Sequence, residues 1–299
     1  MADDQKFLAD IQSDNADVRF TAWRQAGEVS PAVIPQLGKQ AASDNPGMAK
    51  AAREALTTMV HFVGKNPAAA NRAAVVKGLL GLAGPGSAAS VRVHAIRLLS
   101  NIAGEDSAPA IAKWIQTPEL AEEVAFCLER IPGSAPNKAL IAAYKDAKDE
   151  FKPRILAALG HRRAAEAAGL SVEAMRSPNL KIAVAGVKAF GRIGRKPASA
   201  PRYPDTKAMS EWQRIDQMDS LLRYADAQAK EGSVAEAIGV YKSALARSEE
   251  HWQCAAIIGL ARIGTAEAAA AILPKLKSEN PKVRITAENA WKGMAEAKV

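Results

Sequence analysis

The stretch Ala16-Asp17-Val18-Arg19-Phe20-Thr21-Ala22 is the opening of a predicted helix, and it recurs along the chain. It returns as Ser90-Val91-Arg92-Val93-His94-Ala95, as Pro281-Lys282-Val283-Arg284-Ile285-Thr286-Ala287, and more loosely as Asn179-Leu180-Lys181-Ile182. A helix opening repeated at wide, fairly even spacing is typical of a stacked array of helical repeats. The sequence therefore predicts a solenoid in which each repeat packs on its neighbours.

Composition favours helices throughout the chain. Its 299 residues exceed the usual size of one compact core, a limit from which a solenoid escapes. Aromatic residues make up only 5% of the chain, and much of the 48% hydrophobic fraction is alanine, the strongest helix former. Runs of alternating β-branched residues, the signal of strands, are absent. We therefore expect an all-α fold, a right-handed superhelix of about seven or eight antiparallel helix pairs with almost no sheet.

Glycines and capping residues predict where these helices end and begin. Glycine adopts the left-handed conformation that closes a helix, and a serine, threonine or asparagine before a proline suits a helix start. First helices are expected to end at Gly27, Gly64, Gly104, Gly133, Gly160, Gly194 and Gly264. Second helices are expected to begin near Ser30, Asn66, Ser107, Ser134 and Arg163. Caps before proline are expected at Ser30, Thr117, Ser177 and Asn280.

The combination of a Val-Arg opening, small residues in mid-helix and an Ile-Gly ending resembles HEAT repeats. Arg192-Ile193-Gly194 and Arg262-Ile263-Gly264 are typical endings. The resemblance is closest to the short bacterial, phycobilisome-lyase type. It implies HEAT-like repeats over residues 1–194 and again over 249–299, and it implies a solenoid without specifying a function.

The array is interrupted between these two regions. Residues 195–208 form a proline-rich basic segment, read as an irregular loop that projects from the edge of the stack. A long helix is expected from about Thr206 to Lys230, longer than the ordinary repeat helices. Residues 209–248 resemble a single tetratricopeptide hairpin, carried by the small and aromatic positions Ala225, Gly232, Ala237, Tyr241 and Ala244.

No residue pattern in the chain indicates chemistry. The four histidines are not spaced for a metal site, and neither a nucleophile elbow nor a phosphate-binding glycine loop occurs. Cys127 and Cys254 lie far apart in apolar helical contexts, which indicates buried thiols and not a disulfide framework. We expect a protein that is not an enzyme and has no catalytic residues, cofactor or metal.

Sequence alone also limits what can be said of location. No apolar run reaches membrane-spanning length, and the N-terminus has no signal peptide, so we expect no membrane partner. The compartment is expected to be cytoplasmic by default, or exported if Met1 was added to a mature chain.

The net charge of +8 arises from 40 basic and 32 acidic residues that are interspersed, which favours a mixed, solvated surface. We expect a scaffold that binds a protein or peptide on a concave surface lined by second helices. One alternative is a nucleic-acid-binding solenoid that uses the positive balance. The other is a lyase-type HEAT chaperone subunit.

Two sets of basic residues are candidates for function. The repeated helix-start residues Arg19, Arg92, Lys181 and Arg284 are expected to be structural and to bridge to acidic or carbonyl groups of the adjacent repeat. The partner-binding candidates cluster around the interrupting segment: Arg192, Arg195, Lys196, Arg202, Tyr203 and Lys207.

Overall fold

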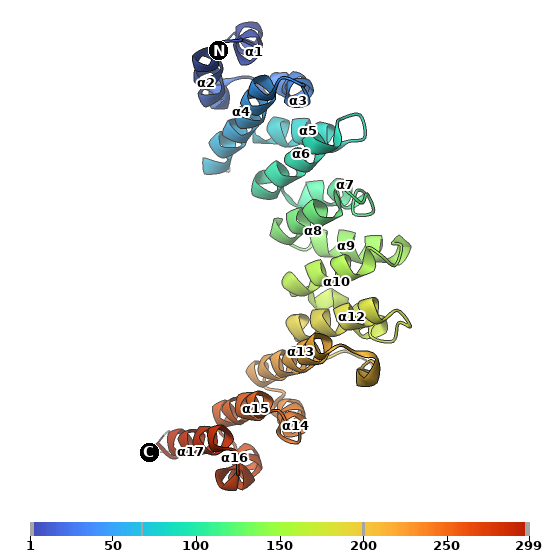
Figure 1. Cartoon of the computed structure of the whole chain (residues 1–299), viewed down its shortest axis with the longest axis vertical. Coiled ribbons are helices and arrows are strands. Elements are labelled where there is room, and N and C mark those ends of the chain that lie inside the picture. The colour runs from blue at the N-terminus through green and yellow to red at the C-terminus, as the bar shows by residue number, and fades with distance from the viewer. Residues whose placement is uncertain (1–2, 67, 199–200, 297–299) are drawn as a thin grey trace. The chain divides into compact units, whose positions relative to one another are not determined.

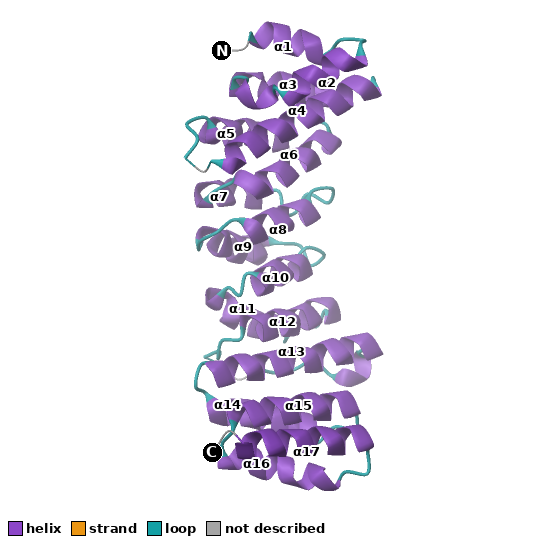
Figure 2. Ribbon diagram, turned by 90° about the vertical axis from the view of Figure 1, so that its left-hand side faces the viewer, coloured by secondary structure: helices purple, strands orange, loops and turns teal. Residues whose placement is uncertain are grey.

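The chain is built entirely of helices over the part that the structure covers. The computed structural model describes residues 3–66, 68–198 and 201–296 (Figure 1). These residues form seventeen α-helices and six short 3-10 helices, with no strand among them. The expected all-α solenoid is confirmed (Figure 2).

First and second helices alternate along the chain. The first helices are α2 (Ala16–Arg24), α4 (Pro46–Lys65), α6 (Ala89–Ile102), α8 (Ala121–Arg130), α10 (Lys152–His161), α12 (Leu180–Ile193), α13 (Glu211–Lys230), α15 (Glu250–Ile263) and α17 (Pro281–Glu296). The second helices are α1 (Asp4–Ile11), α3 (Ile34–Ala41), α5 (Arg72–Ala83), α7 (Ala108–Ala112), α9 (Ala135–Asp146), α11 (Ala168–Ala174), α14 (Val234–Leu245) and α16 (Ala266–Ile272). Every first helix except α12 and the last is followed directly by a second helix.

Short 3-10 helices lie between these elements. They are η1 (Ala26–Glu28), η2 (Pro31–Val33), η3 (Glu105–Ser107), η4 (Ala165–Ala167), η5 (Thr206–Ala208) and η6 (Leu273–Lys277). Three of them, η2, η3 and η4, lead straight into a second helix. Second helices therefore begin close to where the sequence placed them, with α5 the exception, since it starts six residues after Asn66.

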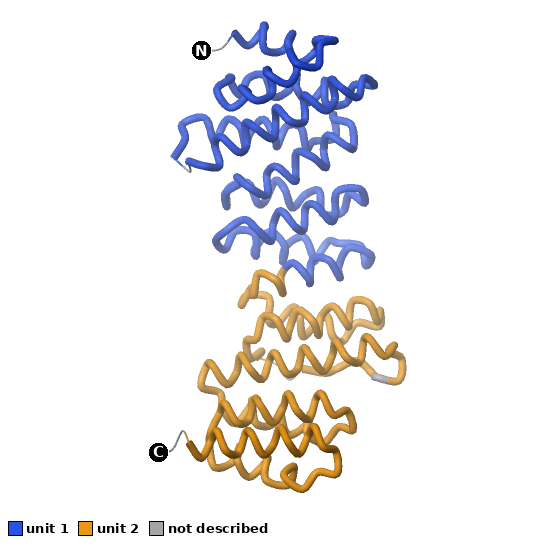
Figure 3. The backbone as a smooth tube through the Cα atoms, turned by 60° about the vertical axis from the view of Figure 1, so that its left-hand side comes forward, with its two compact units in different colours: residues 1–158 blue, residues 159–299 orange. Residues whose placement is uncertain are grey.

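Contacts divide the chain into two compact units, residues 1–158 and 159–299 (Figure 3). In unit 1 the core is formed by side chains such as Ile34, Leu79 and Leu99, each with no exposed surface. In unit 2 a corresponding cluster is built around Tyr241, Ile257 and Leu260. Burying one such side chain stabilises the fold by roughly 1.5–3 kcal/mol, so the facing helices hold each unit together.

A Ser-x-Asn turn opens four of the first helices. In α2, α4, α12 and α17 the side chain of an asparagine accepts a hydrogen bond from the backbone two residues on: Asn15, Asn45, Asn179 and Asn280. In the first three, the asparagine N–H also donates to the serine two residues earlier, at 3.2 Å. The sequence reading missed this repeat signature because it sought caps directly before proline.

The proline-based caps are confirmed at only two of four positions. Ser30 accepts from the N–H of Ala32, and Asn280 caps α17. The prediction is wrong at Ser177, because α12 starts two residues later with Asn179 as its cap. It is also wrong at Thr117, because α8 begins only at Ala121.

Three of the four repeated basic residues are structural, as expected, whereas Lys181 is exposed and forms no ion pair with a described residue. Arg19 donates to the carbonyl of Ser13 at 2.6 Å, and Arg284 donates to that of Ser278 at 2.8 Å. Arg92 is buried, donates to the carbonyl of Ala83 and pairs with Glu119, each at 3.0 Å. Arg92 thus binds the last residue of the preceding second helix, where carbonyls lack intrahelical partners, whereas Arg19 and Arg284 bind the serine of the turn that opens their own helix.

An arginine–carbonyl contact also occurs at a position that the repeated Val-Arg opening does not predict. Arg53 of α4 donates to the carbonyl of Ala41, the last residue of α3, at 3.1 Å. The second repeat therefore has the same arginine–carbonyl contact although it lacks the Val-Arg opening. We call this contact the arginine clamp.

Glycine closes fewer helices than predicted. Gly194 and Gly264 cap α12 and α15 in the left-handed conformation, with φ of 68° and 70°, and Gly133, with φ 80°, follows α8. First helices do end within three residues of Gly27, Gly64, Gly104 and Gly160, at Arg24, Lys65, Ile102 and His161, but these four glycines are not left-handed caps, because they lie in a 3-10 helix, within α-helices or in extended backbone. Close approach explains Gly160, since a Cβ there would lie 3.0 Å from Cα of Ala189.

Candidate protein-docking surface

The proline-rich segment is held against unit 2 by two ion pairs. Arg195 lies 2.9 Å from Glu231, and Lys196 lies 2.7 Å from Glu236. Glu231 directly follows α13, and Glu236 belongs to the first turn of α14. Both basic side chains are exposed, yet their charges are already matched within the chain.

Tyr203 anchors the same segment on its other side. Its ring packs against a cluster of buried residues from α11, α12 and α13: Val172, Met175, Val187, Phe190 and Tyr224. Burial raises the pKa of the Tyr203 hydroxyl to about 12. The expectation that residues 195–208 project from the stack is therefore wrong for the described residues. The segment instead follows α12 in the place where other first helices are followed by a second helix.

A short polar network joins this segment to the hairpin α13–α14. The hydroxyl of Tyr224 donates to Glu236 at 3.1 Å, and Lys196 binds the other oxygen of that carboxylate. The hydrogen bond from Lys196 lowers the pKa of Glu236. The ring of Tyr224 lies 4.4 Å from that of Phe190, between centroids. The segment is thus part of the packing of unit 2.

The remaining candidates divide into one shielded residue and two free ones. Arg192 is half-buried on α12, whereas Arg202 and Lys207 are exposed. Neither Arg202 nor Lys207 forms an ion pair with a described residue. The six predicted residues therefore do not form one basic patch, because two are paired and Tyr203 faces the core.

A groove of about 750 Å³, the α14 groove, lies between the segment and α14. Its lining mixes charges, with Asp205 and Glu236 beside Arg247. Gln217 is 9% exposed and lines this groove, and its amide oxygen has no hydrogen-bond partner in the described structure.

The helix expected from about Thr206 to Lys230 is shorter than expected. It is α13 (Glu211–Lys230), which has 20 residues, the same number as α4.

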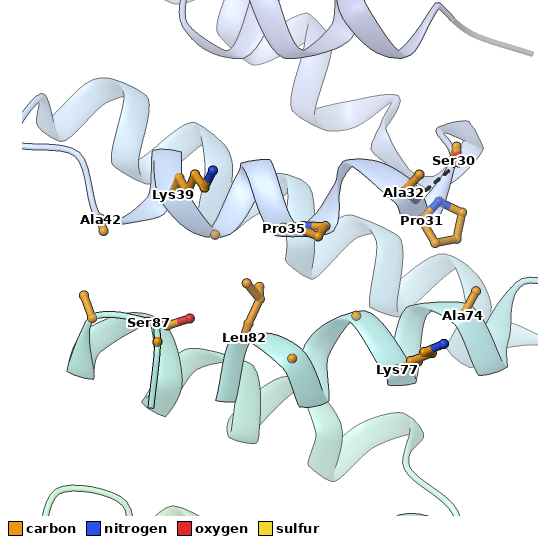
Figure 4. Close-up of a pocket in the computed structure, with 15 residues that line it drawn as sticks. Ser30, Pro31, Ala32, Pro35, Lys39, Ala42, Ala74, Lys77, Leu82 and Ser87 are labelled. Atoms are coloured by element: carbon orange, nitrogen blue, oxygen red, sulfur yellow. Dashed lines mark hydrogen bonds between the residues drawn. The ribbon is translucent and has the colours of Figure 1, made fainter. Parts of the chain in front are cut away.

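A further groove lies in unit 1, between the second helices α3 and α5 (Figure 4). This α3–α5 groove holds about 1070 Å³. The helices approach closely at its base, because Gly38 faces Leu82 and Gly78 faces Ile34, where added Cβ atoms would collide. Gly81, by contrast, opens into the groove with nothing within 4 Å of an added Cβ.

A second groove repeats this arrangement between α7 and α9. The α7–α9 groove holds about 440 Å³ and is lined by Pro109, Ala112, Ala135, Ala139 and Ala142, among others. Small side chains again leave space between two rigid helices. The grooves are therefore a property of the second-helix surface of unit 1.

Each groove carries a lysine on each wall. Lys39 and Lys77 stand on α3 and α5 (Figure 4), and Lys113 and Lys138 stand on the two walls of the α7–α9 groove. All four are exposed, and none forms an ion pair with a residue that the structure describes. We call these four residues the lysine surface.

The sequence reading missed the lysine surface because it judged charge over the whole chain. Residues 55–104 contain no acidic side chain and five basic ones, and the second-helix regions 29–43, 107–118 and 134–145 contain no acidic side chain either. Counting charge helix by helix, and not globally, would have shown it.

The described residues show little that supports chemistry. Burial raises the pKa of the Cys127 thiol to about 12, which keeps it protonated and unreactive at neutral pH. Within the described ranges there is no group of three or more histidine, cysteine, aspartate or glutamate side chains that could hold a metal ion. No helix there is both long and apolar enough to cross a membrane.

No protein-family model and no curated protein sequence matches the chain. Solved structures are similar at low identity. One is an engineered protein, with 18% identity, a TM-score of 0.44, and 99% of this chain and 89% of that chain covered.

Another is Kap121p, with 13% identity, a TM-score of 0.49, and 98% of this chain covered. A Kap121p mutant matches at 14% identity and a TM-score of 0.47, again over 98% of this chain. The chain spans only 41% and 33% of those two chains. The helices and contacts of this chain establish its fold, and these likenesses add nothing about its function or partner.

Proposed function

We propose that this protein is a non-enzymatic scaffold that binds another protein along the second-helix surface of unit 1. One observation carries the proposal: grooves of about 1070 and 440 Å³ open between successive second helices, each with small residues on its walls and a lysine on either side. Concave sites with apolar walls and a few polar groups are typical of ligand binding.

The build of the grooves supports a role in recognition. Their walls are helices, which hold binding groups more firmly than loops do. Alanine, glycine and proline leave room that a partner's side chains can fill without displacing any side chain of the scaffold. The repeated arginines point the other way, into the stack, where they stabilise the array without facing a partner.

The basic segment remains a proposed second docking region. Arg202 and Lys207 are its exposed, unpaired charges, and the neighbouring α14 groove supports it. Arg192, Arg195, Lys196 and Tyr203 would then hold the segment in place for docking. The short bacterial type of the repeats and the tetratricopeptide-like character of residues 209–248 are likewise proposals.

Three glycines allow a test in which each groove is filled without disturbing the fold. Gly81 lines the α3–α5 groove, Gly239 lines the α14 groove, and Gly169 lies outside both on α11. An added Cβ meets nothing within 4 Å at any of them. All three glycines lie within helices, where replacing glycine favours the helix by about 1 kcal/mol.

Peptides should first be selected from a random displayed library against the whole chain, and their affinities measured by fluorescence anisotropy. Gly81→Leu should weaken the selected peptides about tenfold or more, while Gly169→Leu leaves them unchanged. Loss of binding only in Gly239→Leu would move the site to the basic segment. Peptides indifferent to all three changes, or no selected peptides at all, would refute a groove-based binding function.

A further inference from the structure

The second-helix surface of unit 1 has an unbalanced charge. Acidic residues occur in α1, as Asp4 and Asp10, but are missing from α3, α5 and α7, and α9 has one only at its last residue, Asp146, at the end of the α7–α9 groove. The first helices α2, α4 and α8, by contrast, carry both signs, and Arg97 of α6 is paired with Glu123 of α8. An excess of one charge on one face attracts partners of the opposite charge and speeds their encounter.

The arginines of this region are occupied within the fold. Arg72 donates to the carbonyl of Ile102 at 2.9 Å, and Arg92 and Arg97 are bound to Glu119 and Glu123. Among the residues that line the two grooves, the basic ones are the four members of the lysine surface. Each is an ammonium group at the rim of an apolar groove.

This combination specifies the chemistry of an occupant. A carboxylate satisfies an exposed ammonium group, and a small apolar side chain fills a groove walled by alanine, glycine and proline. An extended segment presents alternate side chains to opposite sides, so it can offer carboxylates to the rims and apolar side chains to the grooves.

The walls favour protein over nucleic acid. Binding of single-stranded nucleic acid relies on bases stacking on aromatic rings, and no aromatic residue is among the lining of either groove. Duplexes are held through arginine and lysine on phosphates, whereas here the arginines are engaged inside the fold and the space between the lysines is apolar.

We propose that the lysine surface binds an extended acidic segment of a partner protein. Its carboxylates pair with Lys39, Lys77, Lys113 and Lys138, and its apolar side chains enter the α3–α5 and α7–α9 grooves. This inference rests on the proposed binding function and names the class of partner for the same surface.

The probe is a fluorescent peptide of six Glu-Leu-Pro repeats, which proline keeps extended. Its controls are the matching Lys-Leu-Pro peptide, a single-stranded oligonucleotide and a short DNA duplex. The test variant of the full chain combines Lys39→Gln, Lys77→Gln, Lys113→Gln and Lys138→Gln. The matched control removes the same charge at exposed lysines elsewhere: Lys6→Gln, Lys50→Gln, Lys65→Gln and Lys230→Gln. Circular dichroism melting confirms that both variants fold.

We expect the acidic peptide to bind and the basic peptide not to bind. The groove variant should lose about tenfold or more in affinity, since it removes four exposed pairs that each contribute up to about fivefold, and the control variant should change about twofold or less. Raising the salt concentration should weaken the wild-type complex. Gly81→Leu should weaken it too.

Three results would overturn the inference. Equal losses in both variants would mean that only net charge matters. Tighter binding of the oligonucleotide or duplex, lost in the groove variant, would assign the surface to nucleic acid. Library-selected peptides that are blocked by Gly81→Leu but lack acidic residues would refute the acidic partner and leave the binding function intact. If Gly81→Leu blocks nothing, the binding function itself fails.

Discussion

The two units share one architecture and differ in the surface that their second helices present. In unit 1 the second helices α3, α5, α7 and α9 carry lysines and no acid until Asp146, and two grooves open between them. In unit 2 they carry Glu173, Glu236 and Glu267, of which the last two are bound to lysines. A proline-rich segment also stands there in place of one second helix.

The difference separates what the repeat needs from what it leaves free. Capping asparagines and carbonyl-binding arginines occur in both units, as at Asn15 and Arg19 in one and at Asn280 and Arg284 in the other. Those features hold first helices onto their predecessors. The outward side of the second helices is not needed for stacking, so it can be charged, grooved or interrupted without loss of the fold.

The largest effect is expected from the tightest helix contact in unit 2. A Cβ on Gly191 of α12 would lie 2.7 Å from Cα of Ser220 in α13, and backbone cannot rotate away. Gly191→Ala should destabilise unit 2 by about 3 kcal/mol. Gly38→Ala in unit 1 is the matched control and should cost far less, because its obstacle is the flexible side chain of Leu82. Urea denaturation followed by hydrogen exchange locates each loss, and equal losses would contradict the distinction.

Arg92→Ala tests whether the arginine clamp is structural. It should leave the carbonyl of Ala83 unpaired and lower the free energy of unfolding by about 1–3 kcal/mol. Affinity for the acidic peptide should not change. The control is Arg24→Ala, which removes only an exposed stacking contact with Phe20. A stable Arg92→Ala protein that no longer binds would reverse the assignment.

Tyr203→Ala tests the structural role of the proline-rich segment. Removing a half-buried ring from the Phe190–Tyr224 cluster should cost about 1–2 kcal/mol, less than for a fully buried aromatic. Arg202→Ala, on the same segment but exposed, should cost almost nothing. Thermal melting of both variants decides the matter. Unchanged stability of Tyr203→Ala would show that the segment is not part of the packing.

The smallest effect is a pH dependence confined to unit 2. The pKa of Glu236 is lowered in the folded chain, chiefly by its hydrogen bond to Lys196. Its contribution is therefore present above the unfolded pKa of about 4.3 and is lost as pH falls through the lower, folded pKa. Because the pair is partly exposed, the contribution should be below about 1 kcal/mol.

Glu236→Gln is the corresponding variant. Glu54→Gln on α4 serves for comparison, because the Glu54 carboxylate forms no ion pair with a described residue. Stability measured by urea at pH 7 and at pH 3 should differ between Glu236→Gln and wild type only at pH 7. A difference of equal size at both pH values would show that the effect is not one of charge.

The sequence predicted the repeat and failed where the outcome depends on distant partners. Val-Arg openings mark first helices because each arginine has a nearby target, a backbone carbonyl in the turn or helix just before its own helix. Whether Gly160 ends a helix or packs inside one depends on Ala189, which is remote in sequence. The packing of Tyr203 likewise depends on distant residues, since only folding brings its partners from α11, α12 and α13 together.

The arrangement of the six candidate site residues depended on distant partners too. The basic segment was singled out for its local density of charge, but Glu231 and Glu236, which neutralise two of its members, come from later helices. The four members of the lysine surface come from four different second helices, so no short window of sequence contains them together. The sequence signal for this surface is the absence of acidic residues from these helices before Asp146, and a search for motifs does not detect an absence.

The arginine clamp has a consequence for how such a chain lengthens. Arg19, Arg53, Arg92 and Arg284 each bind backbone carbonyls, which every sequence possesses. A copied helix pair would thus bring its own arginine, and that arginine would find a backbone carbonyl to bind at any insertion point. No second mutation would be required. Duplication and loss of repeats are then tolerated events, and the number of grooves on the surface becomes a trait that can vary between descendants while the join between repeats stays the same.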